Sequence, residues 1–300
     1  MEDSNSIKAE WNAIIASKLK KGTTLEDLKF EYPSGIVMEP NVTAEDIKEY
    51  DHSLDPSKPW INMAAINNGN SADKNRLSLQ ALQHGANGLS IEISKSDSIA
   101  EVLKDVLTEY LDVRIDCSQL SNDEIDLQKA SLSKENYPNI RWISKNGTSK
   151  QVSISQNDRV QSIKHLLTDI KSNGHTDVIV SLSKSLLFEI ASLRAIRALL
   201  NESNIKSFQI LARFDVEGTN ELGDYNLIEK TYKVMSGILG GADAVITSYL
   251  GDEDSRLTLN IHNVLDLESG MKNVMDPLGG SFYIEKLTGE IIRQVNEIKE

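Results

Sequence analysis

From about residue 60 onward, short apolar runs alternate with longer amphipathic runs. The apolar runs are rich in Val and Ile and are bounded by Gly, Asn, Asp or Ser, as buried parallel strands tend to be. Eight strands are therefore expected, at residues 61–66, 88–93, 113–117, 141–144, 177–182, 208–214, 244–247 and 273–275.

Amphipathic helices are expected between these strands. An apolar stripe from Ile99 to Tyr110 predicts one helix, which Ser98 and Glu101 would open as a capping box. Further stripes with the helical period run over Val160–Ile170, Tyr225–Leu239 and Leu257–Leu265.

A strand–helix unit repeated about eight times predicts right-handed crossovers and a parallel sheet, hence the α/β class. Eight units in roughly 240 residues fit a (β/α)8 TIM barrel over residues 58–300 better than an open sheet. The polar, Ser/Asn-rich stretch 118–157 is the weakest unit, and a doubly wound sheet remains the alternative.

Residues 1–57 fall outside this pattern and predict an N-terminal arm of helical and extended segments. Its first helix has an apolar face made of Ile7, Trp11, Ile14 and Ile15. Thr24 and Thr43 each stand three residues before an aspartate, which suggests two further helix starts. The arm either covers the outside of the barrel or clasps a partner chain. In the second case Trp11, Ile14 and Ile15 are the expected partner interface.

Composition narrows the classes of protein. The 300 residues are 39% hydrophobic and 26% charged, which is typical of a folded domain, and the formal charge of −13 disfavours nucleic acid as a partner. The N-terminus has no signal-peptide character, and no apolar run reaches the roughly 20 residues needed to span a bilayer. We therefore expect a cytoplasmic protein without a membrane partner. The single cysteine, Cys117, excludes an internal disulfide and a multi-thiolate metal site.

Candidate chemistry is sparse, although active sites of (β/α)8 barrels lie at the C-terminal ends of the strands. The expected mouth residues are Asn67, Asn68, Glu92, Lys95, Asp116, Cys117, Ser183, Lys184, Arg213, Asp215, Glu217, Ser248 and Tyr249. None of the five histidines is predicted there. His262 and Asp266 have a ligand-like spacing, which is more often a solvated helix face than a metal site. We assign no catalytic residue and no metal site, and cofactor-binding residues stay unidentified.

The segment from Asp276 to Thr288 is more distinctive. Its Gly279–Gly280–Ser281 loop opens a helix and could hold an anion on backbone N–H groups, or could be a tight turn that needs glycine. The tight turn is the favoured interpretation, so both glycines are expected to be structural.

Together with Gly240–Thr247, this segment resembles the barrel domain of methylmalonyl-CoA mutase. Ile190–Leu200 is similar to a helix of that family, with Ser192 where lysine is usual, and Ser71–Arg76 and Gly85–Ser90 resemble its first helix and second strand. The family-motif residues, expected to be structural, are Asp276, Pro277, Gly279, Gly280, Ser281 and Tyr283. The arm resembles the N-terminus of the small subunit of two-chain bacterial enzymes.

Departures from the catalytic chains shape what the resemblance implies. Residues 51–60 lack the tyrosines of the substrate-threading loop. Residues 209–218 do not match the family's His-x-x-x-Gln-Thr-Ser-Gly pattern, so the histidine and the glutamine of that pattern are missing. The cobalamin-binding signature Asp-x-His-x-x-Gly does not occur in the sequence.

The resemblance therefore implies the small, non-catalytic subunit of a heterodimeric mutase that interconverts methylmalonyl-CoA and succinyl-CoA. Its large catalytic subunit would be the partner and would hold the adenosylcobalamin, so this chain alone is expected to bind no cofactor and to be inactive. At most a vestigial acyl-CoA contact is expected. The alternatives are a barrel chain that is catalytic with a separate cobalamin-binding chain, and a free-standing binding module.

Overall fold

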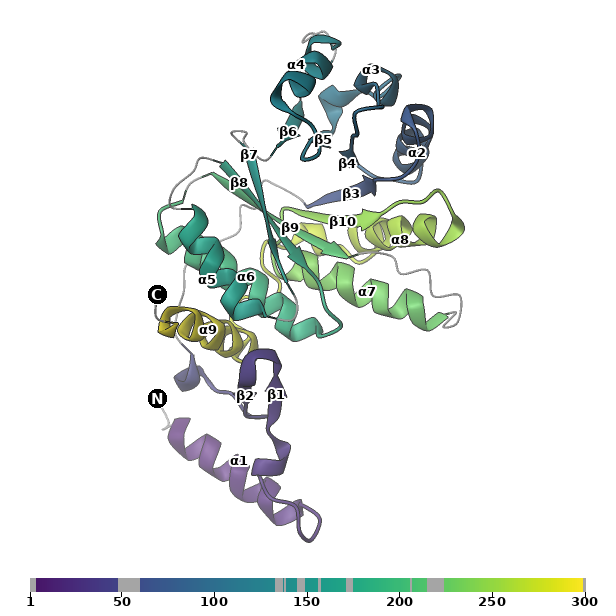
Figure 1. The fold of residues 1–300 in the computed structure, drawn as a ribbon. Helices are drawn as coiled ribbons and strands as arrows, with labels where there is room; N and C mark the ends of the chain where they lie inside the picture. Colours follow the sequence, from purple (N-terminus) through teal and green to yellow (C-terminus); the bar gives the residue numbers. More distant parts are fainter. Residues whose placement is uncertain are drawn as a thin grey trace.

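The computed structural model describes residues 4–47, 60–132, 137, 139–144, 149–155, 158–170, 175–205, 207–214 and 224–298. At its centre is an eight-stranded sheet in which all the registered strand pairs are parallel (Figure 1). The strands are β3 (Ile61–Ile66), β4 (Gly88–Glu92), β5 (Asp112–Asp116), β6 (Ile140–Ile143), β7 (Ser149–Ile154), β8 (His175–Ser181), β9 (Phe208–Phe214) and β10 (Ala244–Ser248).

The strand order is β6-β5-β4-β3-β10-β9-β8-β7. Except for β6 and β7, consecutive strands are neighbours, and the last strand pairs with the first, which is the cyclic order of a (β/α)8 barrel rather than of a doubly wound sheet. Among the described residues no registered pair joins β6 to β7, so the curled sheet is open there. The predicted α/β, TIM-barrel-like fold is confirmed.

Helices follow the strands and cover the outer face of the sheet. They are α2 (Ser71–Gln83), α3 (Ile99–Val102), α4 (Asn122–Ala130), α5 (Arg159–Ile170), α6 (Leu186–Glu202), α7 (Asp224–Leu239), α8 (Glu253–Asn263) and α9 (Phe282–Glu297). Local capping explains several starts: the side chains of Asn70, Ser121 and Asp252 accept backbone N–H groups at the beginning of α2, α4 and α8.

Alternation along each strand separates two apolar environments. In β3, Ala64 and Ile66 pack outward with helix residues, whereas Met63 and Ala65 point into the barrel. The same alternation puts Ile246 of β10 in the interior. The continuous apolar run of such strands thus reflects burial on both faces.

Two predicted elements are wrong. Residues 273–275 are not a strand: Gly270 has a φ of +68°, the chain makes a short 3-10 turn at Met271–Asn273, and Val274 is exposed. The eighth strand is instead β7, in which four of the six residues are polar. The helix predicted from Ile99 to Tyr110 ends at Val102, and Asp105 has a φ of +63°, which a helix cannot contain.

Two short elements complete this part of the chain, the 3-10 turn Thr108–Tyr110 before β5 and the π-helical turn Val264–Glu268 after α8. The expected capping box at Ser98 has no side-chain cap hydrogen bond. No helix in the described ranges combines the length and apolar character needed to cross a bilayer.

Over residues 4–47, the part of the arm that the structure describes, there are one helix, one hairpin and single turns. Its elements are α1 (Ser4–Lys18), η1 (Glu26–Leu28), β1 (Phe30–Tyr32), η2 (Pro33–Gly35), β2 (Ile36–Met38) and η3 (Ala44–Asp46). The two helix starts expected after Thr24 and Thr43 are one-turn 3-10 helices. The hairpin β1–β2 lies between α1 and α9 (Figure 1), and its buried side chains join the core formed by α5, α6 and α9.

Candidate functional site

The interior of the barrel is the first place to seek a site, because a ligand of a (β/α)8 barrel approaches the strand ends. Met63, Leu211 and Ile246 fill its centre, each no more than 2% exposed. These are large side chains from strands β3, β9 and β10. The middle of the barrel is therefore packed with apolar groups.

A polar cluster crosses the interior toward the N-terminal ends of the strands. Arg114 of β5, only 1% exposed, donates to Asp177 of β8 and to Gln209 of β9, each at 2.6 Å. Arg141 of β6 donates to the same carboxylate at 2.8 Å and also contacts Gln209. Asp112 accepts from Nε of Arg114 at 2.9 Å. We call Arg114, Arg141, Asp177 and Gln209 the arginine brace.

The arginine brace links the half of the sheet that ends at β6 to the half that ends at β7. The two halves are also joined by the backbone pairing of β3 with β10. Arg114 and Arg141 belong to the half that ends at β6, and Asp177 and Gln209 to the half that ends at β7. Sequence reasoning missed these residues. The available signal was a charged residue inside an apolar strand, since Arg114 stands between Val113 and Ile115.

At the mouth, the expected carboxylates are engaged by neighbouring polar groups. Asp116 accepts from the backbone N–H and the hydroxyl of Ser118, and Glu92 accepts from the amide of Gln119. Such bonds hold the carboxylates at the rim rather than aiming them at a common point.

The other expected mouth residues do not converge on a site either. Lys95 and Lys184 are exposed and form surface ion pairs. Asn67 and Asn68 are exposed, whereas Ser183, Arg213 and Ser248 are half-buried. Asp215 and Glu217 lie outside the described residues.

Two expected mouth residues point the other way. Cys117 faces the helices, where burial raises the pKa of its thiol to about 12. Tyr249 also turns outward, and its hydroxyl lies 2.7 Å from Nδ1 of His84 at the end of α2. Placing these two side chains at the mouth was wrong, because adjacent residues of a strand face opposite sides of a sheet.

Three histidines have described side chains, and all three lie on the helical layer. His84 is the C-cap residue that follows α2, His165 is exposed on α5, and His262 is a buried residue of α8. Burial lowers the pKa of His262 to about 3, and neither ring nitrogen has a hydrogen-bond partner. The described residues hold no group of three or more His, Cys, Asp or Glu that could bind a metal.

The distinctive segment after residue 275 is tied to α6 by a buried ion cluster. Arg194 donates to both oxygens of Asp276 at 2.9 and 3.0 Å, and to Glu285 at 2.7 Å. Arg194 is 1% exposed. Two sequence motifs about 80 residues apart thus meet in one ion cluster, which is a structural role.

The loop between these acids is a tight turn. Gly280 has a φ of +79°, where only glycine is unstrained, and Ser281 begins α9 as its N-cap residue. Gly279 donates to the carbonyl of Asp276 at 3.2 Å. Pro277 is exposed, and the hydroxyl of Tyr283 lies 3.2 Å from that of Tyr32 in the arm.

The other quoted motifs also form buried or half-buried ion pairs. Arg197 of α6 donates to Asp243 at 2.9 Å, and the same carboxylate accepts the N–H of Ile210. Lys74 of α2 donates to Asp97 at 2.7 Å with both side chains buried. The charged motif residues therefore hold helices and loops in place outside the barrel.

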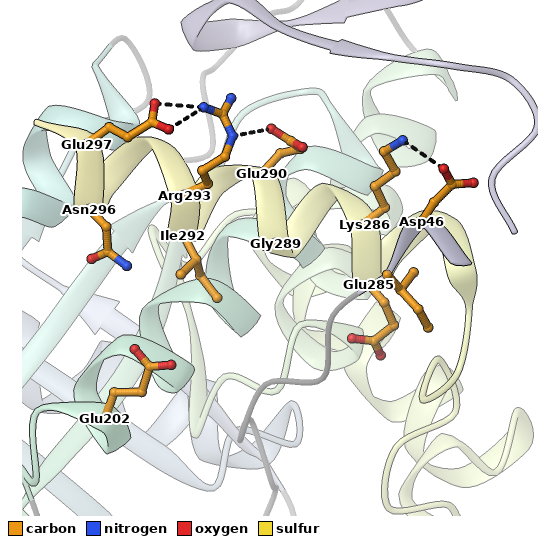
Figure 2. Close-up of a pocket in the computed structure, with 11 residues that line it drawn as sticks. Asp46, Glu202, Glu285, Lys286, Gly289, Glu290, Ile292, Arg293, Asn296 and Glu297 are labelled. Carbon is orange, nitrogen blue, oxygen red and sulfur yellow. Dashed lines mark hydrogen bonds and ion pairs between the residues drawn. The ribbon is translucent and has the colours of Figure 1, made fainter. Parts of the chain in front are cut away.

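Two outer surfaces complete the candidates. Along α9 runs a groove of about 590 Å³ bordered by Glu202 and by the pairs Lys286–Asp46 and Arg293–Glu290 (Figure 2). On α1, the expected partner-interface residues are accessible: Ile14 is 47% exposed, and Trp11 and Ile15 are half-buried. Their role as an interface stays a prediction.

Comparison with known proteins supports one family. Residues 177–300 match the model of the methylmalonyl-CoA mutase family. Methylmalonyl-CoA mutase of Escherichia coli K12 is 31% identical over 130 residues, covering 38% of this chain and 18% of that protein. The bovine mitochondrial enzyme is 30% identical over 134 residues, covering 37% and 18%.

A third relative is the 2-hydroxyisobutanoyl-CoA mutase large subunit of Aquincola tertiaricarbonis, 34% identical over 82 residues, covering 25% of this chain and 15% of that protein. The matched part thus spans less than a fifth of each of these relatives. Part of this chain, residues 177–300, is therefore similar to the methylmalonyl-CoA mutase family.

Among solved structures, dihydropteroate synthase of Xanthomonas albilineans is similar with a TM-score of 0.44 and 11% identity, covering 71% of this chain and 95% of that one. A likeness at this level carries no inference about function.

Proposed function

We propose that this chain is the small, non-catalytic subunit of a heterodimeric, adenosylcobalamin-dependent methylmalonyl-CoA mutase. A homologous large subunit would interconvert methylmalonyl-CoA and succinyl-CoA and hold the cofactor. This chain would contribute a barrel flank and the arm as binding surfaces. The similarity of residues 177–300 supports the family, and the side chains of this chain support the finer assignment.

The observation that carries the non-catalytic assignment is the filled barrel. A long acyl-CoA passing through the interior would have to displace the apolar centre around Met63 and then the arginine brace. Separating Arg114 from Asp177 would leave buried charges without a partner, which is strongly unfavourable. The interior of this chain thus opposes a threaded ligand.

The side chains also fit the cofactor poorly. Cobalamin chemistry needs a protein ligand or a bound base on the metal and polar groups around the reacting substrate. The histidines with described side chains, His84, His165 and His262, all lie in or directly after helices outside the sheet. We therefore derive no reaction step on this chain and propose that the large subunit holds the cofactor.

A second candidate is a barrel chain that binds an acyl-CoA and works with a separate cobalamin-binding chain. The polar rim of the mouth, where Arg213, Ser181 and Ser248 are half-buried, favours it. A vestigial acyl-CoA contact would lie there. The nearby carboxylates of Glu92 and Asp116 would repel the carboxylate of a methylmalonyl group, so we rank this candidate second.

Co-expression with the large mutase subunit of the same organism tests the proposal. We expect a complex with one copy of each chain by native mass spectrometry, with mutase activity only when the large subunit is present. Trp11→Ala should weaken the association while the barrel stays folded. Leu127→Ala, an exposed apolar position on α4, is the matched control and should leave the association unchanged.

Two results would reject the assignment. Micromolar binding of adenosylcobalamin with turnover of methylmalonyl-CoA by the isolated chain would establish a catalytic subunit. Purification from the native cell without any mutase large chain would instead favour a free-standing module.

A further inference from the structure

The hairpin β1–β2 of the arm is attached to the barrel by buried apolar side chains. Tyr32, Ile36 and Met38 are between 0% and 6% exposed and pack into the main core. Tyr32 also stacks on Phe188 of α6, with ring centroids 6.0 Å apart. This attachment does not depend on charge.

The attachment of α1 is different. No side chain from Ile7 to Lys18 is buried, and the innermost positions, Lys8, Trp11 and Ile15, remain half-exposed. The amide of Asn12 accepts a hydrogen bond from Asn41 at 3.0 Å. In Figure 1 the helix lies at the far end of the molecule, separated from α9 by the hairpin. α1 therefore lacks a buried apolar anchor of its own.

Four charges hold α1 in place. Nζ of Lys8 lies 2.9 Å from both oxygens of Asp46 and 3.0 Å from Oε2 of Glu39. Lys286 of α9 approaches Asp46 at 3.5 Å from the other side (Figure 2). Asp46 thus links the helix of the arm to the last helix of the barrel.

We propose that α1 is a strap that this charge cluster fastens reversibly, so that ionic strength releases α1 while the hairpin stays docked. The inference deepens the proposed function, because a released strap is free to meet the large subunit, but the fastening itself involves this chain alone.

Salt is expected to release α1 because dissolved ions screen the charge cluster. The side chains of Lys8, Asp46 and Lys286 are 18–22% exposed, and Glu39 is 38% exposed, so solvent ions reach the cluster. The Debye length falls from about 14 Å at 0.05 M salt to about 3 Å at 1 M. Partly exposed ion pairs of this kind lose part of their attraction over that range.

A change of protonation near neutral pH is not expected to release α1. Burial opposes the charge of Asp46, but the Thr43 N–H and Lys8 overcome it and hold the pKa of the carboxyl well below its usual range. The pKa of Lys8 is raised, because its bonds to Asp46 and Glu39 outweigh its burial. The cluster stays charged at neutral pH.

Release should also melt the helix. An isolated helix of about 15 residues is marginal in water, because nucleation is costly and few hydrogen bonds repay it. The 15 residues of α1 would therefore lose backbone protection when they leave the barrel. Hydrogen exchange of α1 thus reports its docking directly.

Hydrogen–deuterium exchange of the full chain, without any partner, tests the strap. Between 0.05 and 1 M NaCl we expect exchange in residues 4–18 to rise roughly fivefold. Exchange in residues 30–38 should stay constant or slow, because salt also screens the repulsion within a chain of net charge −13. Faster exchange in residues 4–18 together with constant or slower exchange in residues 30–38 would distinguish the release of α1 from unfolding of the whole chain.

Variants make the test specific. Lys8→Gln should give fast exchange in α1 at low salt and remove the salt dependence, whereas Lys8→Arg should retain both. Lys18→Gln removes the same charge from an exposed site on the same helix and should behave like the parent. Asp46 is left intact, because its carboxylate also caps η3.

Equal protection of α1 at both salt concentrations, or a Lys8→Gln variant that matches its parent, would overturn the strap. Neither result would bear on the mutase assignment, which the co-expression experiment tests separately.

Discussion

At the scale of single residues, the burial of His262 makes the free energy of unfolding depend on pH. Its pKa is about 3 in the folded chain and near 6.5 when unfolded, so between these values only the unfolded chain takes up the proton. Stability from the neutral ring is complete above pH 6.5 and falls as the pH decreases, by up to about 1.4 kcal/mol per pH unit.

We therefore predict that His262→Leu reduces the loss of stability between pH 7 and pH 5, as measured by urea unfolding at each pH. His165→Leu, an exposed position on α5, should retain the parent's dependence. Identical slopes for the parent and His262→Leu would contradict this origin of acid sensitivity.

Gly280 is a second single-residue case. A Cβ built there meets no atom within 4 Å, so only the φ of +79° opposes substitution. Gly280→Ala should lower the free energy of unfolding by about 1 kcal/mol. Gly280→Asn should cost less, because asparagine tolerates the left-handed region. Urea unfolding measures both, and an Ala variant as stable as the parent would remove the structural role.

At the element scale, Arg194 couples α6 to α9 through Glu285 and the Asp276 turn. Glu285→Gln weakens a buried charge-assisted bond and should destabilise the chain by about 2 kcal/mol. Glu290→Gln, on the same helix but in an exposed pair with Arg293, should cost about 0.5 kcal/mol or less. Thermal unfolding of both variants checks the contrast, and equal losses would contradict the coupling.

How well the sequence predicts a strand depends on how completely the strand is buried. β3 and β10 are buried on both faces and consist mostly of apolar residues, and both were predicted correctly. β7 forms only one registered pair among the described residues, with β8, and its Ser-Lys-Gln-Val-Ser-Ile sequence carries a weak signal. Val274 and Met275 look like strand residues, but they are exposed after a left-handed Gly270.

Candidate-site residues were harder to predict for a geometric reason. The repeat of strands and helices indicates a barrel mouth, but which side of the sheet a residue faces depends on exact strand boundaries. The sequence placed both Asp116 and Cys117 at the mouth, but adjacent residues face opposite sides of the sheet, and Cys117 packs against the helices. The arginine brace joins residues 36 to 95 positions apart, and no local pattern encodes such pairs.

At the scale of the whole molecule, the arginine brace substitutes for missing backbone pairing. β6 and β7 share no registered pair among the described residues, yet Arg141 of β6 and Arg114 of β5 both bind Asp177 of β8. One buried carboxylate thus faces two guanidinium groups across the open seam. The brace therefore links the two edges of the sheet, whose halves are joined elsewhere by the pairing of β3 with β10.

We predict that Asp177→Asn destabilises the chain by about 3 kcal/mol, because two arginines would then face each other inside the barrel without their shared carboxylate. Hydrogen exchange in β6 and β7 should accelerate more than in β3 and β10, whose pairing is intact. Asp126→Asn on the exposed face of α4 is the matched control, and it should change neither quantity. Equal acceleration in all strands would indicate a loss of overall stability and no specific role of the brace at β6 and β7. Unchanged exchange would show that the brace does not stabilise these two edge strands.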